Sequence, residues 1–180
     1  LMDRMNLRLA LSKTLTRPEY FELIEREDRE LFENLKSYGN PQLEHTLISN
    51  YDFRWEFYPR PGELFAISYF YKNLQRPIEY IYIQKGTQTL KPINTKETRN
   101  SGLEFEIRKQ LDFIWSRMSN LSINANYAII RSKIKIDQTG SNGFVLTNSQ
   151  RPLTGQSPYV VNIAFGYENK LGTTFRFLYN

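Results

Sequence analysis

The chain has 180 residues, with 12 Tyr, 12 Phe, a single His and no Cys, and its formal net charge is +5. The length suits one compact domain, and the lack of Cys excludes a disulfide framework and thiol chemistry. Positive and negative residues alternate along most of the chain, which excludes a Lys/Arg block typical of nucleic-acid binding, and no apolar run approaches the roughly 18 residues of a membrane helix.

Seven segments alternate apolar and polar residues with the period of two that is typical of β-strands. In chain order they are Met5–Lys13, Leu47–Phe57, Glu63–Lys72, Gly102–Lys109, Leu121–Arg131, Tyr159–Tyr167 and Thr173–Tyr179. Their lengths approach the roughly 9–11 residues of a tilted strand that crosses a membrane, whereas strands of soluble proteins average about 5–6 residues. The pattern therefore favours long strands with one apolar and one polar face.

The connections between these segments alternate between short and long. Tyr58–Gly62 and Glu168–Gly172 are tight turns with Gly or Pro, and Leu111–Asn120 is a somewhat longer turn at the same end. The opposite end carries three long segments: Thr14–Thr46, Asn73–Ser101 and Ser132–Ser157. Short turns on one edge and long loops on the other are typical of outer-membrane barrels, whose long loops are external.

The first long segment is predicted to contain a helix. Thr16 and Glu19 have the spacing of a capping box, with Thr16 at the N-cap and Glu19 at the third helical position. Gly39 is a natural C-terminal stop. Between them, apolar residues recur near helical spacing at Phe21, Ile24, Leu31 and Leu35. We therefore expect a helix over Glu19–Lys36, with its charges on a solvated face.

Alternation alone does not say whether the apolar face points into a core or toward lipid, because a soluble barrel has the same pattern with its faces exchanged. Two features favour lipid. Aromatic residues lie near strand ends, where Tyr and Trp form interfacial girdles. The polar face carries charges of both signs, which a water-filled or plugged lumen accommodates, at Arg8, Asp52, Arg54, Glu56, Glu104, Glu106, Arg108 and Arg176.

The fold class that follows is all-β, an antiparallel transmembrane β-barrel segment with one short helix in an external loop. The odd strand count indicates part of a larger barrel, because single-chain bacterial barrels have even numbers of strands. The chain opens abruptly at Leu1-Met2-Asp3-Arg4 without a signal-peptide pattern. We therefore expect a fragment whose preceding region and final strand or strands lie outside it.

No catalytic, cofactor-binding or metal residues are predicted. Glu104 and Glu106 lie on one strand face about 7 Å apart by strand rise, a separation at which two carboxylates could serve a glycosidase. A charged lumen wall beside Arg108 accounts for them better. His45 has no Cys neighbours that would complete a metal site, and nucleophile-elbow, P-loop and dinucleotide motifs are missing. The chain is therefore not expected to be an enzyme, and its substrate-binding residues stay unassigned.

A series of short stretches resembles, in order, the C-terminal barrel of TonB-dependent receptors of the Bacteroidetes type. The series covers nearly the whole chain, and its first two stretches resemble a paired loop motif of that family. The stretches are Thr16–Tyr20, Gly39–Leu43, Phe70–Ile78, Asn100–Glu104, Arg151–Tyr159 and Leu178–Asn180.

The resemblance implies that residues 1–180 are a single C-terminal β-barrel fragment, with the plug domain outside the chain. The whole barrel would have about 22 strands and would lie in the cell outer membrane. It would import a nutrient, such as an iron chelate, cobalamin, a glycan or a peptide, with energy from the TonB complex reached through a missing N-terminal region. Its expected partners are outer-membrane lipid, its own plug, the TonB complex and the nutrient, with no cofactor and no nucleic acid.

Two other function classes stay open. A structural or adhesive outer-membrane barrel would lack energy coupling and an upstream plug. A soluble β-barrel or sandwich that binds a small apolar ligand would be complete at about this length and soluble without detergent. A hydrolase on a barrel scaffold is disfavoured, because the sequence lacks a catalytic set.

Overall fold

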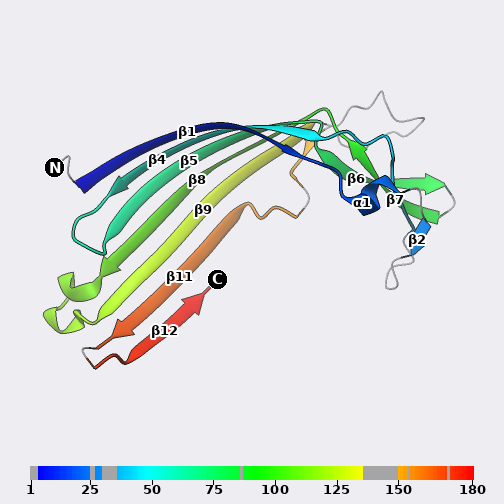
Figure 1. Cartoon of the computed structure of the whole chain (residues 1–180). Helices are drawn as coiled ribbons and strands as arrows, with labels where there is room; N and C mark the ends of the chain where they lie inside the picture. Colours follow the sequence, from blue (N-terminus) through cyan, green and yellow to red (C-terminus); the bar gives the residue numbers. More distant parts are fainter. Residues whose placement is uncertain are drawn as a thin grey trace.

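The computed structural model describes residues 4–24, 27–29, 36–85, 87–135, 150–153, 155–169 and 171–180. Long antiparallel strands form one sheet in the order β1-β4-β5-β8-β9-β11-β12 (Figure 1). Their bounds are β1 Met5–Thr16, β4 Thr46–Phe57, β5 Leu64–Gln75, β8 Glu97–Gln110, β9 Leu121–Lys135, β11 Tyr159–Glu168 and β12 Thr174–Tyr179. These are the seven predicted strands, and the all-β antiparallel fold class is confirmed.

The sheet is a curved wall rather than a closed barrel (Figure 1). β1 forms one edge and β12 the other, and in the part of the chain that the structure describes no strand pairs with the outer side of either. An open edge presents unpaired backbone N–H and C=O groups. The wall therefore has two edges at which further strands could pair.

The pairing register converts the alternation of the sequence into two different faces, because residues paired across neighbouring strands lie on the same side of a sheet. One row across the sheet is apolar: Leu7, Trp55, Ile67, Phe105, Tyr127 and Val161. The next row is largely polar: Asn6, Glu56, Ala66, Glu106, Asn126 and Asn162. A slip of one residue in any strand would exchange its faces.

Short turns join the strands at one end, as predicted. Gly62 and Gly172 have φ angles of 82° and 81°, the left-handed conformation that glycine adopts without steric cost. The Asn169 side chain accepts hydrogen bonds from the backbone of Leu171 and Thr173, each at 2.9 Å. The connection between β8 and β9 contains two 3-10 helices, Leu111–Phe113 and Ser116–Met118.

The predicted helix over Glu19–Lys36 is wrong beyond its first turn. The helix α1 covers only Tyr20–Leu23, and its capping box joins Glu19 to Glu22 rather than Thr16 to Glu19. Thr16 is instead the last residue of β1, where it pairs with Thr46 of β4. Strand pairing at this point overrides the local helical signal. Two short strands follow, β2 Glu27–Arg29 and β3 Lys36–Tyr38, while residues 25–26 and 30–35 lie outside the described residues.

The predicted loop Asn73–Ser101 also contains strands that the sequence pattern did not predict. They are β6, Ile78–Lys85, and β7, Thr87–Asn94, and a second sheet has the order β2-β3-β7-β6. It lies at the loop end of the main sheet (Figure 1). In the predicted loop Ser132–Ser157, β10, Gln150–Arg151, pairs with the end of β9, and residues 136–149 and 154 lie outside the described residues.

Side-chain hydrogen bonds hold the base of these loops together. The Asn94 amide nitrogen donates to the carbonyl oxygens of Glu44, at 2.9 Å, and Arg76, at 2.8 Å, and the Asn94 amide oxygen accepts from the Glu44 backbone N–H at 2.8 Å. The Thr46 hydroxyl donates to the same Arg76 carbonyl at 3.0 Å. These bonds tie the segment before β4 to the β5–β6 and β7–β8 connections.

Among the described residues, no helix has the length and apolar character that crossing a membrane would require.

The sequence resemblance also included Gly39–Leu43, which lies beside α1. A Cβ at Gly39 would come within 2.1 Å of the Ile24 carbonyl oxygen, and the Asn40 side chain accepts from the Gln42 backbone at 3.1 Å. This stretch shapes the backbone at the loop end.

Candidate functional site

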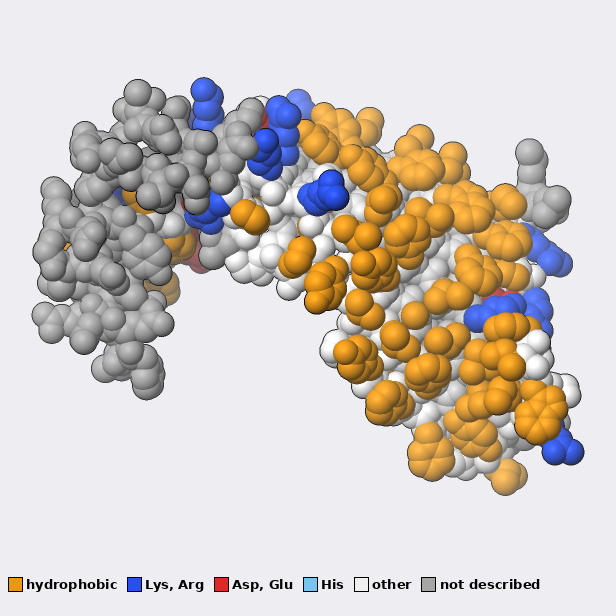
Figure 2. Space-filling view, turned by 180° about the vertical axis from the view of Figure 1, so that it is seen from behind, with side chains coloured by type: hydrophobic (Ala, Val, Ile, Leu, Met, Phe, Trp, Pro, Cys, Tyr) orange, Lys and Arg blue, Asp and Glu red, His pale blue; other side chains and the backbone are white. Residues whose placement is uncertain are grey.

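One face of the main sheet is apolar and exposed. Even in the central strands, Phe53, Ile67, Phe105 and Tyr127 are between 37% and 42% exposed. Figure 2 shows hydrophobic side chains across this face, with Lys and Arg side chains toward both ends of the hydrophobic area. Soluble monomers rarely expose contiguous apolar patches beyond a few hundred Å². This face therefore needs an apolar partner.

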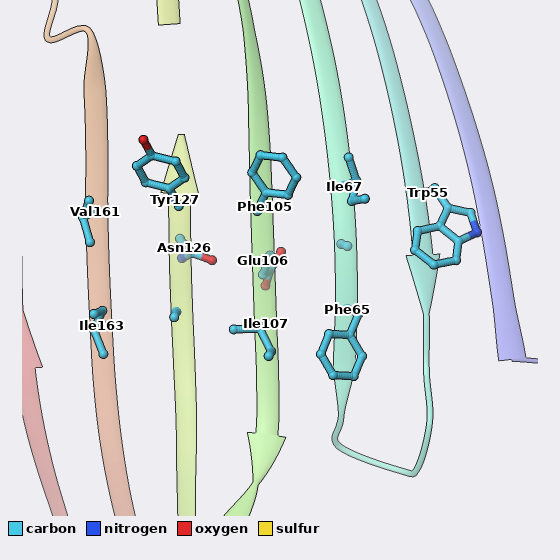
Figure 3. A pocket seen from close by; sticks show the side chains of 12 residues that line it. Trp55, Phe65, Ile67, Phe105, Glu106, Ile107, Asn126, Tyr127, Val161 and Ile163 are labelled. Carbon is cyan, nitrogen blue, oxygen red and sulfur yellow. The ribbon is translucent and has the colours of Figure 1, made fainter. Parts of the chain in front are cut away.

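A depression of about 530 Å³ lies on this face between the side chains of neighbouring strands (Figure 3). Its apolar walls are Trp55, Phe65, Ile67, Phe105, Ile107, Tyr127, Val161 and Ile163. In Figure 3, Phe105 and Ile107 stand in front of their strand while Glu106 lies behind it. With almost no polar group in its walls, the depression suits hydrocarbon rather than a hydrogen-bonding ligand.

The opposite face carries an ion-pair network across β4 and β8. The Arg54 guanidinium donates to Glu56 at 2.8 Å and to Glu106 at 2.7 Å. Glu56, which is 3% exposed, also accepts from the Tyr58 hydroxyl at 2.9 Å. Arg108 pairs with Glu106 at 2.6 Å. Two guanidinium groups thus contact the Glu106 carboxylate, so this part of the polar face is a wall of paired charges.

A second depression, of about 420 Å³, lies on this polar face and is our candidate ligand-contacting site. Its polar lining residues are Asp52, Arg54, Ser68, Lys72, Asn100, Glu104 and Gln156. The Gln156 amide nitrogen donates to the Asn100 side-chain oxygen at 3.1 Å. The Lys72 ammonium lies 5.9 Å from the centre of the Phe70 ring. Hydrogen-bond donors and acceptors, together with side chains of both charges, could therefore contact a polar ligand here.

The sequence placed most of these residues on the polar face but did not bring them together as a site. Gln156 in particular comes from the connection before β11, which has no periodic pattern, and no signal in the sequence directs it toward Asn100.

His45 is exposed in the segment before β4. Across the described residues, no group of three or more His, Asp or Glu could hold a metal ion.

A compact charge cluster locks two of the short turns together. Arg60 makes two contacts of 2.6 Å with Asp112, and it contacts Glu63 at 2.5 Å. Lys109 donates to Glu63 at 2.7 Å, and the Glu63 side chain is 1% exposed. Hydrogen bonding from Arg60 lowers the pKa of Glu63 to about 2 and also lowers the pKa of Asp112. The cluster joins the β4–β5 turn to the β8–β9 turn.

Replacing Glu63 with Gln is expected to destabilise the protein by about 2 kcal/mol at neutral pH, because Arg60 and Lys109 lose a charged acceptor. The folded-state pKa of Glu63 is below its ordinary value of 4.5. The stabilisation from Glu63 is therefore complete above about pH 4.5 and is lost as the pH falls toward 2.

Urea unfolding in detergent at pH 7, 4 and 3 measures this effect as the difference between wild type and Glu63→Gln. The difference should shrink as the pH falls. Glu168→Gln, an exposed carboxylate at the end of β11, serves as the control and should follow the wild-type profile. A difference between wild type and Glu63→Gln that stays constant across the three pH values would contradict the assignment.

Comparison with known proteins gives the following matches. A family model described as TonB dependent receptor-like, beta-barrel, matches residues 1–180. Similar solved structures include the siderophore receptor PirA from Pseudomonas aeruginosa, at 14% identity and a TM-score of 0.60, with 98% of this chain and 36% of that one covered. The copper transporter OprC is 18% identical, with a TM-score of 0.66, and the match covers 94% of this chain and 23% of that one.

A third similar structure is a double mutant of the hemophore receptor HasR from Serratia marcescens, in complex with its hemophore HasA and heme. Its identity is 12% and its TM-score 0.64, with 99% of this chain and 30% of that one covered. The chain thus spans between 23% and 36% of the length of these three structures, and at such identities the likeness concerns the fold. No curated protein sequence matches the chain.

Proposed function

The chain belongs to the TonB-dependent receptor-like β-barrel family, and we propose that it forms part of the barrel wall of an outer-membrane receptor that imports a nutrient. The observation that carries this proposal is the contrast between the faces of the sheet. The apolar face is exposed even in the central strands, as contact with lipid requires. The polar face holds a connected ion-pair network, which a lumen accommodates.

The polar depression is the place where this wall would contact cargo or plug. It combines an anionic group, Asp52, with a cationic one, Lys72, and with amide groups from Asn100 and Gln156. The structurally similar receptors include a siderophore receptor and a copper transporter. By analogy, the proposed cargo is a polar nutrient, such as an iron chelate, cobalamin, a glycan or a peptide.

The proposal extends to regions beyond this chain. Residues 1–180 are one piece of a larger barrel, supported by the open edges at β1 and β12. A plug domain would occupy the lumen, and the TonB complex would supply energy through a region N-terminal to the barrel. Import in the native host, measured with and without a working TonB complex, tests this coupling. Receptor-dependent uptake that persists unchanged without TonB would contradict it.

Fractionation of the native host tests the location. An antibody against this segment is expected to detect a band in the outer membrane, with an apparent mass well above the 21.4 kDa of this chain. A soluble band near 21.4 kDa would overturn the proposal. The apolar face would then have to be the interior of a small ligand-binding barrel.

A further inference from the structure

A group of cations interrupts the apolar face at its loop end. Arg99 of β8 and Arg131 and Lys133 of β9 are all exposed. Arg131 and Lys133 continue the alternation of Tyr127 and Ile129 along β9, so they stand on the apolar face. Arg99 is the register partner of Lys133 and therefore lies on the same face. Neutral apolar side chains fill the middle of this face.

Among the described residues, only one of the three cations in this cluster has a carboxylate partner. Neighbouring strands lie about 4.8 Å apart, and like charges directly opposite each other destabilise a sheet. Arg99 has a carboxylate partner, Glu97, at 3.2 Å. In the described part of the chain, Arg131 and Lys133 make no ion pair. An anion bound between Arg99, Arg131 and Lys133 would remove the repulsion.

An apolar groove begins beside this cluster. A depression of about 340 Å³ is lined by Tyr69, Ser101, Gly102, Leu103, Ile129 and Arg131. Arg131 lies at its loop end, while Leu103 and Ile129 continue toward the middle of the strands. The site thus places the Arg131 guanidinium next to apolar side chains. A molecule that complements such a surface has an anionic headgroup and an apolar tail.

The cluster also lies at the level where lipid headgroups are expected. Register pairing places Tyr51, Tyr71, Ser101 and Arg131 in one row across the sheet, and the rings of Tyr51 and Tyr71 are 5.9 Å apart. Tyr side chains prefer the membrane–water interface. The long loops mark this end as external, so the row lies in the outer leaflet.

We propose that Arg99, Arg131 and Lys133 bind the phosphate of an anionic lipid of the outer leaflet, whose acyl chain lies in the groove between Leu103 and Ile129. Guanidinium groups suit this role because they donate two parallel hydrogen bonds to phosphate. The inference rests on the proposed placement of the sheet in the outer membrane.

The test uses the full receptor, purified in neutral detergent, and lipid A as the phosphorylated probe. Native mass spectrometry measures the lipid A retained at increasing concentrations. The double variant Arg131→Gln/Lys133→Gln is expected to weaken binding of one lipid A molecule on the order of 10- to 30-fold. The control Arg117→Gln/Arg176→Gln removes the same charge from the β8–β9 connection and from the polar face, and it should bind as wild type does.

Two further probes separate the contribution of the phosphate headgroup to binding from that of the acyl chain. Dephosphorylated lipid A should bind wild type as weakly as phosphorylated lipid A binds the double variant. Inorganic phosphate alone should not displace lipid A at equal concentration, because it lacks the acyl chain. Equal binding of both lipid forms, or full displacement by inorganic phosphate, would overturn the proposal.

Failure of this proposal can be separated from failure of the proposed function. If the receptor lies in the outer membrane but the double variant still binds lipid A as wild type does, only the lipid-site proposal fails. If the fractionation experiment finds the protein in the soluble fraction, both proposals fail. The folded fraction of each variant, read from its electrophoretic shift on heating, shows that a loss of binding does not reflect a loss of structure.

Discussion

A Tyr127→Arg variant is expected to lose about 2–4 kcal/mol of folding stability in a lipid bilayer. Tyr127 stands on the apolar face of a central strand and is 42% exposed. If that face contacts lipid near the middle of the membrane, the guanidinium must either enter hydrocarbon or distort the bilayer around it. The cost arises from the solvent on that side of the wall rather than from lost contacts within the protein.

The matched control is Asn126→Arg, one residue earlier on the same strand. Asn126 pairs in register with Glu106 on the polar face, so the new guanidinium would lie beside a carboxylate. Urea titration of the receptor folded into phosphatidylcholine vesicles compares the two variants. A larger loss for Asn126→Arg than for Tyr127→Arg would show that the faces are reversed, as in a soluble barrel.

A Glu56→Gln variant is expected to lose about 2 kcal/mol of stability. Glu56 is 3% exposed and accepts from Arg54 and Tyr58, and its carboxylate lies 3.1 Å from Arg8. Removing its charge leaves Arg54 with Glu106 as its remaining ion-pair partner among the described residues. The Arg54 side chain is 28% exposed, so water offsets part of the loss.

Glu104→Gln provides the control for this prediction. Glu104 lies on the same face and is exposed, and the described residues provide it with no ion pair. Its substitution should change stability by no more than about 0.5 kcal/mol. Urea unfolding at neutral pH measures both variants. If they lose equal stability, the ion-pair network does not stabilise the polar wall.

The sequence by itself determined the strands and their faces. Alternation with a period of two identified all seven long strands, because it reflects a backbone whose successive side chains point to opposite sides. Turn residues such as Gly62, with its φ of 82°, fixed where the chain reverses at the short end. These signals are local, so they can be read without knowledge of any partner strand.

Local signals failed where distant segments compete. The helical pattern after Thr16 yielded to pairing between Thr16 and Thr46, which continues β1 into the predicted loop. The second sheet combines β3 with β7, strands that lie far apart in the sequence and pair in parallel. The Ile- and Tyr-rich run from Ile78 favours a strand, and it was the one local signal that could have indicated this hairpin.

Only the tertiary structure decided which polar residues meet. Arg54 and Glu106 are 52 positions apart and lie on strands separated by β5, yet their side chains are 2.7 Å apart. The same holds for Gln156 and Asn100 in the polar depression, and for Arg99 opposite Lys133 on the apolar face. Periodicity assigns a residue to a face, but its neighbours on that face depend on strand order and register, which long-range pairing sets.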